Sequence, residues 1–505
     1  MRKILLHQLL VILFVSSLAS CSKDIGNYTY HDINQITFTD LDTIKGYRVN
    51  YDDSLVLNPT LAMTKDDSHS IGDYIYEWSF RLPNKFGNTS DSVISVNKVL
   101  KIKVGVPPGT YPLQYRITDK KTGVQFHART QLVVVSEIYE GYLVLNDVNG
   151  QSRLDMLSYN KADNSFRQFT DVLKKMGSTL PMQGKPYQVF CMDYTGTNIT
   201  TQNYGVFVLN ASGTSRIDQE TFAYSPALNI RNLIVGNVPV NFTAQGLTGN
   251  LTAASFPLMV MYANDNVYMY STLAGYAFKY TPINVYTPSG APFRISPNII
   301  TNNDRRTVMY NMDKRSFVSA ASYNSTSVTD IPTYPTGYDL VYMNRDYNNK
   351  AFAIMKDPAT AKYRLLRFDI GGLVNDNIEL GPEFANASHY ALSPELGYIF
   401  YSVGGKVFEF DVSTKQSILM VDKGAAIITY LDFQYFYKRL ATPSNNPNYK
   451  DWANLLTVGA YDPGAAPTES GTLELYSVPP VNGQIIKKNS WTGFGKIVSV
   501  CYRER

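Results

Sequence analysis

The sequence predicts an all-β protein, and three observations support this fold class. Short runs of alternating apolar and polar residues dominate, such as "YRLLRF" (363–368) and "KVFEFDV" (406–412), and Gly, Asn, Asp or Pro bound them. Helical periodicity is nearly absent, and "DVLKKMG" (171–177) is the only segment for which a helix is expected. The phrase "GYLVLNDVNGQSRLD" (141–155) also returns as "GVFVLNASGTSRID" (205–218), which indicates a repeated strand unit.

The N-terminus reads as a secretory signal that ends in a lipid-attachment cysteine. Arg2 and Lys3 precede a short apolar run, and "LASC" (18–21) resembles the lipobox of bacterial lipoproteins. In that family the cysteine is acylated and becomes the first residue of the mature chain, which implies a signal peptide over 1–20 and lipidation of Cys21. The alternative is an ordinary signal with a stray cysteine. Several acyl chains would anchor the protein stably, and no later segment is apolar enough to span a bilayer.

The residues that follow Cys21 are expected to form a lipidated tether over 21–31. Within it, "SKDIGNYTY" (22–30) resembles a weak version of the export signal of surface lipoproteins of the Bacteroidetes. A plain polar tether is the alternative interpretation. The resemblance implies an outer-membrane protein that faces the cell exterior.

A first domain is expected over 32–136, and its pattern predicts a β-sandwich. Trp78 lies in the strand "DYIYEWSF", and a core position between two sheets is favoured for its ring over a sugar-stacking surface. The stretch with Pro108, Gly109, Tyr111, Thr118 and Asp119 resembles the "PGTY…TD" pattern of PKD domains, which are immunoglobulin-like. Such modules on surface lipoproteins serve as spacers or docking domains.

The remainder, 137–505, repeats an apolar strand, a turn rich in Asn, Asp or Gly, and a second strand. Repeated hairpins of this kind predict a β-propeller, and the length allows about seven blades of ~50 residues each. The region begins without the strand that elsewhere precedes the hairpin and ends in a lone strand. We therefore expect 496–502 to pair in the first blade, which two stacked sandwiches would not explain.

Charge and cysteine usage limit the classes of partner. Removal of 1–20 takes Arg2 and Lys3 from the 46 basic residues and leaves 44 against 42 acidic residues, so nucleic-acid binding is not expected. Cys191 and Cys501 remain after the anchor. Two buried thiols are favoured over one disulfide, because each cysteine lies in a strand-like apolar run.

No catalytic, metal or cofactor site is expected from the motifs. The few histidines lack metal-ligand spacing, and no nucleophile elbow or phosphate loop occurs. Asp147, Asn149 and Gly150 look like the start of a calcium loop but lack its final glutamate, so a hairpin turn is the favoured interpretation. No carboxylate pair of the kind a glycosidase needs stands out.

The candidate ligand-binding residues are Tyr449 and Trp452, in the polar loop "ATPSNNPNYKDWANLL" (441–456). Loops on a rigid scaffold often carry function, and a loop tryptophan stacks on sugars or grips peptides. The alternative is that Trp452 tucks the loop onto the domain. "TYPTGYDLVY" (333–342) is a weaker candidate.

Taken together, the lipobox, tether, PKD-like module and tyrosine-rich propeller resemble the PKD-like family of Bacteroidetes lipoproteins. The resemblance implies an accessory protein of a SusC/SusD-like TonB-dependent uptake complex that helps to capture a glycan or an oligopeptide. It supplies no catalytic residues. A propeller-type glycosidase or lyase, and a periplasm-facing assembly scaffold, are the alternatives.

Overall fold

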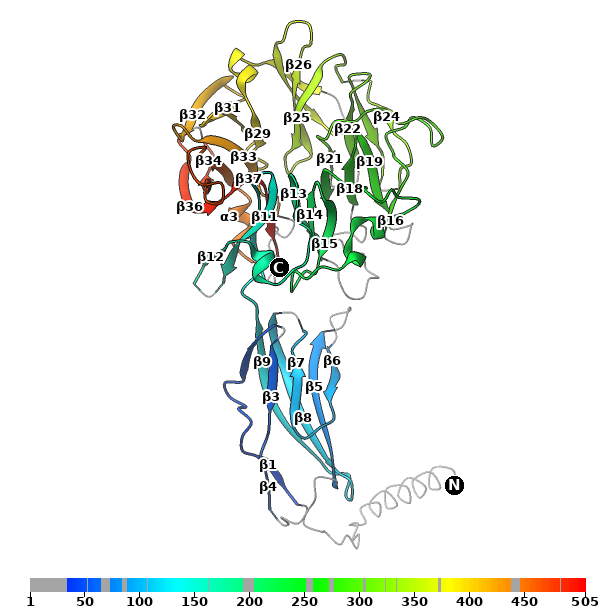
Figure 1. The fold of residues 1–505 in the computed structure, drawn as a ribbon, viewed down its shortest axis with the longest axis vertical. Coiled ribbons are helices and arrows are strands. Elements are labelled where there is room, and N and C mark those ends of the chain that lie inside the picture. Colours follow the sequence, from blue (N-terminus) through cyan, green and yellow to red (C-terminus); the bar gives the residue numbers. More distant parts are fainter. Residues whose placement is uncertain are drawn as a thin grey trace, which may run out of the picture. The chain divides into compact units, whose positions relative to one another are not determined.

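The structure, a computed structural model, divides into two compact units (Figure 1). It describes residues 34–51, 53–64, 73–83, 89–106, 108–161, 163–193, 204–250, 258–271, 277–302, 306–322, 324–332, 334–370, 374–436, 446–481 and 483–505. The units are Met1–Val134 and Val135–Arg505, divided close to the boundary expected from the sequence.

The described residues of the first unit form one large sheet and two strand pairs. The large sheet has the order β2-β9-β8-β5-β6, formed by Tyr47–Asn50, Gln125–Val135, Gly109–Asp119, Tyr74–Pro83 and Thr89–Ser95. The pairs are β1 (Ile36–Phe38) with β4 (Leu61–Met63), and β3 (Ser54–Leu57) with β7 (Leu100–Lys103).

The core of the first unit lies around Trp78, which is fully buried. Its ring stacks on Tyr115 at 4.2 Å between centroids, and its Nε1 donates a hydrogen bond to the Asn97 carbonyl at 3.2 Å. Leucines of β3 and β7 join the same cluster as the inward side chains of the large sheet. The core position expected for Trp78 is therefore confirmed.

The described residues of the second unit form seven sheets of antiparallel strands, one of which carries an extra parallel strand. The first sheet contains β10 (Gly141–Val148), β11 (Gln151–Asn160), β12 (Ser165–Phe169) and β37 (Lys496–Arg503). The second contains β13 (Pro186–Asp193), β14 (Tyr204–Asn210) and β15 (Gly213–Ile217). The third contains β17 (Gly246–Asn250), β18 (Leu258–Ala263), β19 (Asn266–Ser271), β20 (Ala277–Lys279) and the parallel strand β16 (Ile234–Val235). The fourth sheet contains β21 (Ile300–Thr301), β22 (Thr307–Asn311), β23 (Ser316–Ala320) and β24 (Thr329–Asp330), and the fifth contains β25 (Asp339–Arg345), β26 (Lys350–Lys356), β27 (Tyr363–Asp369) and β28 (Val374–Glu379). The sixth contains β29 (His389–Leu392), β30 (Ile399–Val403), β31 (Lys406–Asp411) and β32 (Gln416–Asp422). The seventh contains β33 (Ile427–Phe433), β34 (Leu455–Tyr461), β35 (Gly471–Ser477) and β36 (Ile486–Phe494).

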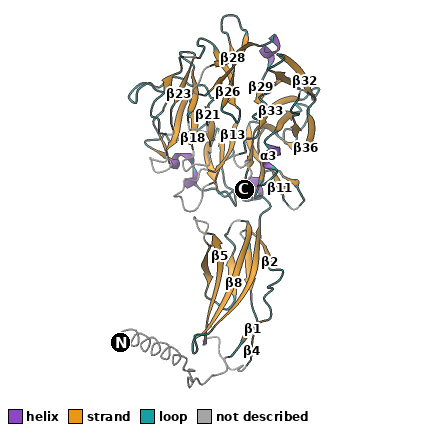
Figure 2. Ribbon diagram, turned by 180° about the vertical axis from the view of Figure 1, so that it is seen from behind, coloured by secondary structure: helices purple, strands orange, loops and turns teal. Residues whose placement is uncertain are grey.

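Helices are few among the described residues, as the purple segments of Figure 2 show. The predicted helix at 171–177 is confirmed as α2 (Val172–Lys175), and α3 (Tyr449–Trp452) lies in the loop that holds the candidate aromatic residues. The 3₁₀ helices are η2 (Pro226–Leu228), η3 (Ile230–Leu233) and η4 (Pro382–Asn386).

One strand of each sheet faces a common centre, and these inner strands contact one another in a ring. The contacts run from β37 to β13, β17, β21, β25, β29 and β33, and from β33 back to β37. This arrangement is propeller-like, and successive sheets pack face to face through apolar clusters.

Neighbouring inner strands belong to different sheets, and polar side chains of one strand form hydrogen bonds with backbone groups of the next. Gln188 of β13 donates to the Leu247 carbonyl of β17 at 3.0 Å and accepts from the Leu247 amide at 2.6 Å. Tyr430 of β33 donates to the Val500 carbonyl of β37 at 3.2 Å. Each bridge satisfies backbone groups that would otherwise be buried without a partner.

The C-terminal strand completes the first sheet, as the sequence predicts. β37 pairs antiparallel with β10, from Gly141 opposite Arg503 to Asp147 opposite Lys496. The repeated phrase forms the β10–β11 and β14–β15 hairpins, so it is a structural repeat. Asn149 and Gly150 both have positive φ at the first hairpin tip, as a tight turn requires.

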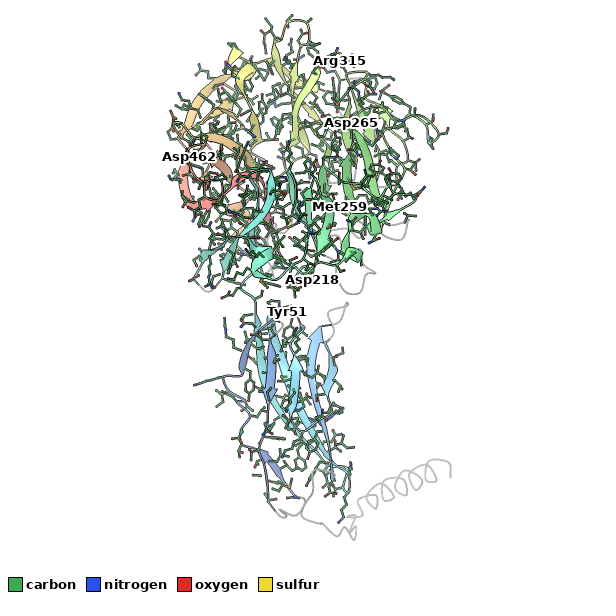
Figure 3. All side chains as sticks on the ribbon, viewed as in Figure 1. Tyr51, Asp218, Met259, Asp265, Arg315 and Asp462 are labelled. Atoms are coloured by element: carbon green, nitrogen blue, oxygen red, sulfur yellow. The ribbon has the colours of Figure 1, made fainter. Side chains whose placement is uncertain are left out.

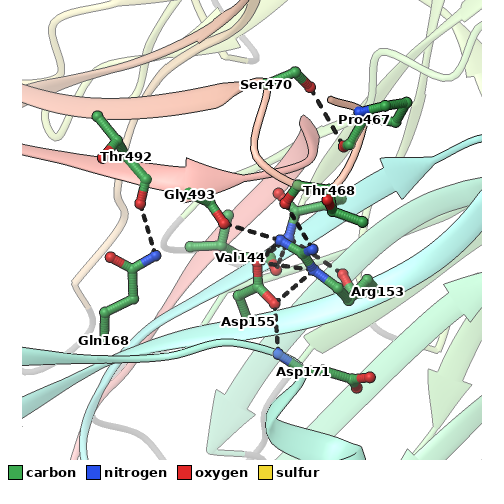
Figure 4. A network of polar contacts seen from close by, with 11 residues as sticks. Val144, Arg153, Asp155, Gln168, Asp171, Pro467, Thr468, Ser470, Thr492 and Gly493 are labelled. Atoms are coloured by element: carbon green, nitrogen blue, oxygen red, sulfur yellow. Dashed lines mark hydrogen bonds and ion pairs between the residues drawn. The ribbon is translucent and has the colours of Figure 1, made fainter. Parts of the chain in front are cut away.

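A buried ion pair lies where the seventh sheet meets the first (Figure 4). Arg153 donates from Nη2 to Asp155 at 2.6 Å, and Asp155 is fully buried. Arg153 also donates to the Thr468 carbonyl at 2.8 Å and to the Gly493 carbonyl at 3.2 Å. Thr468 lies on the turn between β34 and β35 of the seventh sheet, and Gly493 lies in β36 of the same sheet. Gln168 makes a second bridge to the Thr492 carbonyl at 2.9 Å.

Candidate functional site

The inner strands of the second unit surround an open cavity of about 320 Å³, the channel. All seven inner strands line it or reach it at their ends, although they lie far apart in the sequence. Its polar lining residues are Gln188, Thr248, Thr301, Asn344, Arg345, Tyr430, Asp432, Gln434, Tyr435 and Ser499. A volume of this size suits a small ligand or one end of a longer one.

Asp432 is the one carboxylate among the described residues that line the channel. It lies on β33, where its Oδ1 accepts a hydrogen bond from the Phe433 amide at 2.8 Å. Burial raises the pKa of Asp432 to about 7, with that amide acting in the opposite direction. The carboxylate therefore changes charge near neutral pH and can receive a donor from a bound molecule.

Arg345 supplies a positive charge at the end of β25. Its Nη2 donates to the Tyr435 hydroxyl at 3.1 Å and its Nη1 to the Asp346 carbonyl at 3.2 Å. The guanidinium also lies 5.4 Å from the centre of the Tyr435 ring. These contacts hold the side chain in one position beside the channel.

Tyr449 is not a stacking surface, which corrects the prediction made for it. Its side chain is fully buried, and its hydroxyl donates to the Arg505 carbonyl at 3.2 Å and accepts from the Arg505 amide at 2.8 Å. Its ring lies against Phe436 at 5.2 Å between centroids. Tyr449 therefore holds the C-terminal residue in place, because both backbone groups of Arg505 find a partner there.

Trp452 lies in the same helix and is half-buried. Its ring meets Tyr159 edge-on at 4.9 Å and also contacts Phe166 at 5.5 Å and Tyr502 at 5.4 Å. These contacts agree with the alternative in which Trp452 tucks the loop onto the sheets. A ligand contact through its exposed edge stays a prediction, and so does the weaker candidate at 333–342.

Other predicted sites have different outcomes. Cys21 and the tether lie outside the described residues. No group of three or more His, Cys, Asp or Glu side chains suited to a metal ion occurs in the described part of the chain. Among those same residues, no helix is long and apolar enough to cross a membrane.

Sequence reasoning also missed Glu409, a buried acid between the sixth and seventh sheets. Its side chain is 1% exposed, and neither carboxyl oxygen has a hydrogen-bond partner. Burial, and then the charge of Asp411, raise the pKa of Glu409 to about 7. The pKa of Tyr398, on the turn before β30, is raised by burial and then by the negative charge of Glu409. No local motif marks such a residue, because its burial depends on the packing of two sheets.

We expect Glu409 to make the protein less stable as pH rises. The pKa of about 7 in the folded state exceeds its usual 4.5, so the unfolded chain loses its proton first. The contribution of Glu409 is full below pH 4.5 and is lost as pH rises to about 7, by roughly 3 kcal/mol. Urea unfolding of the wild type and Glu409→Gln between pH 4.5 and 8 measures this slope. Equal slopes in the two proteins would contradict the assignment.

Comparisons with known proteins add the following. A Quinonprotein alcohol dehydrogenase-like protein from Bacteroides thetaiotaomicron is 12% identical with a TM-score of 0.43, over 92% of this chain and 99% of that one. Virginiamycin B lyase from Staphylococcus aureus is 9% identical with a TM-score of 0.32, over 57% and 90%. The GH74 xyloglucanase from Xanthomonas campestris is 11% identical with a TM-score of 0.33, over 60% and 45%.

These structures are propeller-like proteins, and nothing about the activity of this chain follows from such distant likenesses. No curated protein matches the chain. Residues 21–186 match the model of the PKD-like family, and this part of the chain is therefore PKD-like.

Proposed function

We propose that this protein is a ligand-binding lipoprotein of the cell surface, whose second unit is a closed seven-bladed propeller. Cys21 anchors it to the outer membrane, and it acts as an accessory of a SusC/SusD-like uptake complex that captures a glycan or an oligopeptide. The observation that carries the binding role is the channel of about 320 Å³, because residues from seven separate sheets converge on it.

The composition of the channel supports binding over hydrolysis. A glycosidase of the common type places two carboxyl groups about 5–10 Å apart across the scissile bond. Among the described lining residues only Asp432 carries a carboxyl group, while amides and hydroxyls supply the other polar contacts. A wall of this kind orients a polar ligand without a second acid to complete the reaction.

Asp432 is expected to be a main polar contact for that ligand. Asp432→Asn keeps the shape of the side chain and removes its charge, so affinity should fall about 10- to 100-fold, as for loss of a charged hydrogen bond. Calorimetric titration with a panel of oligosaccharides and oligopeptides measures the loss. Because the pKa of Asp432 is about 7, a ligand that donates to it should bind the wild type more tightly at pH 8 than at pH 6.

The matched control is Asp462→Asn. Asp462 (Figure 3) is an exposed aspartate on the turn between β34 and β35, where its Oδ1 caps the Gly464 amide at 2.8 Å. It lies outside the channel lining, so its variant should bind like the wild type. Equal affinity of the wild type and Asp432→Asn for every ligand that binds would refute the role given to the channel.

The membrane and partner assignments need a separate experiment. Affinity purification from native outer membranes should recover a TonB-dependent transporter together with this protein, and protease added to intact cells should digest it. Recovery of the protein alone would remove the main support for the uptake role. Resistance to the protease would favour the periplasm-facing scaffold.

A further inference from the structure

The two cysteines beyond Cys21 meet at the position where the ring of inner strands closes. Cys191 lies on β13 and Cys501 on β37, and they are 310 residues apart in sequence. The Cys191 amide donates a hydrogen bond to the Cys501 sulfur at 3.2 Å. Both residues line the channel, and both are thiols in this structure.

The contact belongs to a regular register between the two strands. Two residues earlier, the Val189 amide donates to the Ser499 hydroxyl at 3.2 Å. Side chains at alternate positions of β37 therefore accept from amides at alternate positions of β13. Cys191 belongs to the apolar cluster between the first two sheets, and Cys501 packs against that cluster. The two side chains lie within hydrogen-bonding reach of one another.

We propose that Cys191 and Cys501 are a cross-linking site and form a disulfide once the chain has left the cytoplasm. The bond would tie the C-terminal strand to the second sheet and so lock the ring covalently. This inference does not depend on any ligand of the channel. It goes beyond the proposed function and requires only that an oxidant reaches the chain.

The oxidant is a disulfide-bearing thiol oxidase or a small disulfide of the cell envelope. The Cys501 thiolate attacks one sulfur of that disulfide, and one thiol of the oxidant leaves. The Cys191 thiolate then attacks the Cys501 sulfur, and the second thiol of the oxidant leaves. Two S–H bonds of the protein are lost and one S–S bond forms, while the S–S bond of the oxidant breaks and its two sulfurs take up both electrons and both protons to become thiols.

Exposure decides the order of these steps. Cys501 is half-buried beside the channel and Cys191 is buried, so Cys501 meets the oxidant first. The neighbouring Cys191 thiol and burial raise the pKa of Cys501 well above its usual value. Few thiolates are therefore present at neutral pH, and the folded protein should oxidise slowly and faster as pH rises.

The test uses lipidated protein extracted from membranes and alkylated at once under denaturing conditions. Peptide mapping without reductant should show the Cys191 peptide joined to the Cys501 peptide. Recovery of both cysteines as alkylated thiols would overturn the proposal.

Thermal unfolding provides the second measurement. Reductant should lower the midpoint of the wild type by roughly 5–10 °C. Cys501→Ser is the matched variant, because its hydroxyl can accept the Cys191 amide as Ser499 accepts that of Val189. Its midpoint should not respond to reductant. A wild type that is equally indifferent would also overturn the proposal.

Discussion

A chain that stops at residue 495 should lose the cooperative unfolding of the second unit. β37 buries Ile497, Val500 and Tyr502 against the neighbouring sheets, and all three are at most 6% exposed. At about 1.5–3 kcal/mol for each large apolar side chain, their loss removes roughly 5–9 kcal/mol, which is comparable with the net stability of a typical domain. Denaturant unfolding followed by fluorescence measures the effect.

Two controls distinguish this loss from a general effect of truncation. Lys496→Ala changes an exposed residue of the same strand and should leave the transition unchanged. A synthetic peptide of residues 496–505, added to the shortened chain, should restore part of the transition because β10 still offers its free edge. A shortened chain with the wild-type midpoint would show that β37 does not close the sheet.

Asp155→Ala should destabilise the protein by about 3–5 kcal/mol. It leaves Arg153 without its anionic partner where the first and seventh sheets meet (Figure 4), and an uncompensated cation in such a site is costly. Asp155 also accepts from the Asp171 amide at 2.7 Å and from Asn146 Nδ2 at 2.9 Å. The Asp171 amide would lose this acceptor, whereas Asn146 Nδ2 keeps the Val144 carbonyl at 3.0 Å. Equilibrium urea unfolding measures the change.

The repeat supplies the matched control. Asp218 (Figure 3) ends the second copy of the phrase at the place that Asp155 holds in the first. It caps a turn instead, accepting from the Glu220 amide at 2.9 Å and the Thr221 amide at 2.8 Å. Asp218→Ala should therefore cost only about 1–2 kcal/mol. Equal losses at the two positions would argue against a special role for the ion pair.

The fold was largely predictable because its signals are local. Alternating runs, and turns such as Asn149-Gly150, mark each hairpin without reference to the rest of the chain. The pairing of 496–502 follows from the strand that is missing at the start of the repeat region and the lone strand at its end. Trp78 was placed in the core because a strand that alternates faces buries every second side chain.

The site was less predictable because its residues lie on different sheets and become neighbours only when the inner strands are arranged around a common centre. Asp432 and Arg345 lie on different sheets, and nothing around either residue marks it as part of a channel. Tyr449 was misassigned because a polar loop sequence does not show which of its rings turns inward. Its burial depends on Arg505, a residue 56 positions later in the chain.

The two ends of the second unit pair with one another, so the first sheet cannot be completed until the last strand has been synthesised. Glu140 and Tyr502 share a hydrogen bond and are separated by 362 residues. At about 5–20 residues per second, a ribosome needs roughly 20–70 s to make the chain between them. Until these residues are made, β10 lacks its inner neighbour β37, and an unpaired strand edge can pair with strands of other chains.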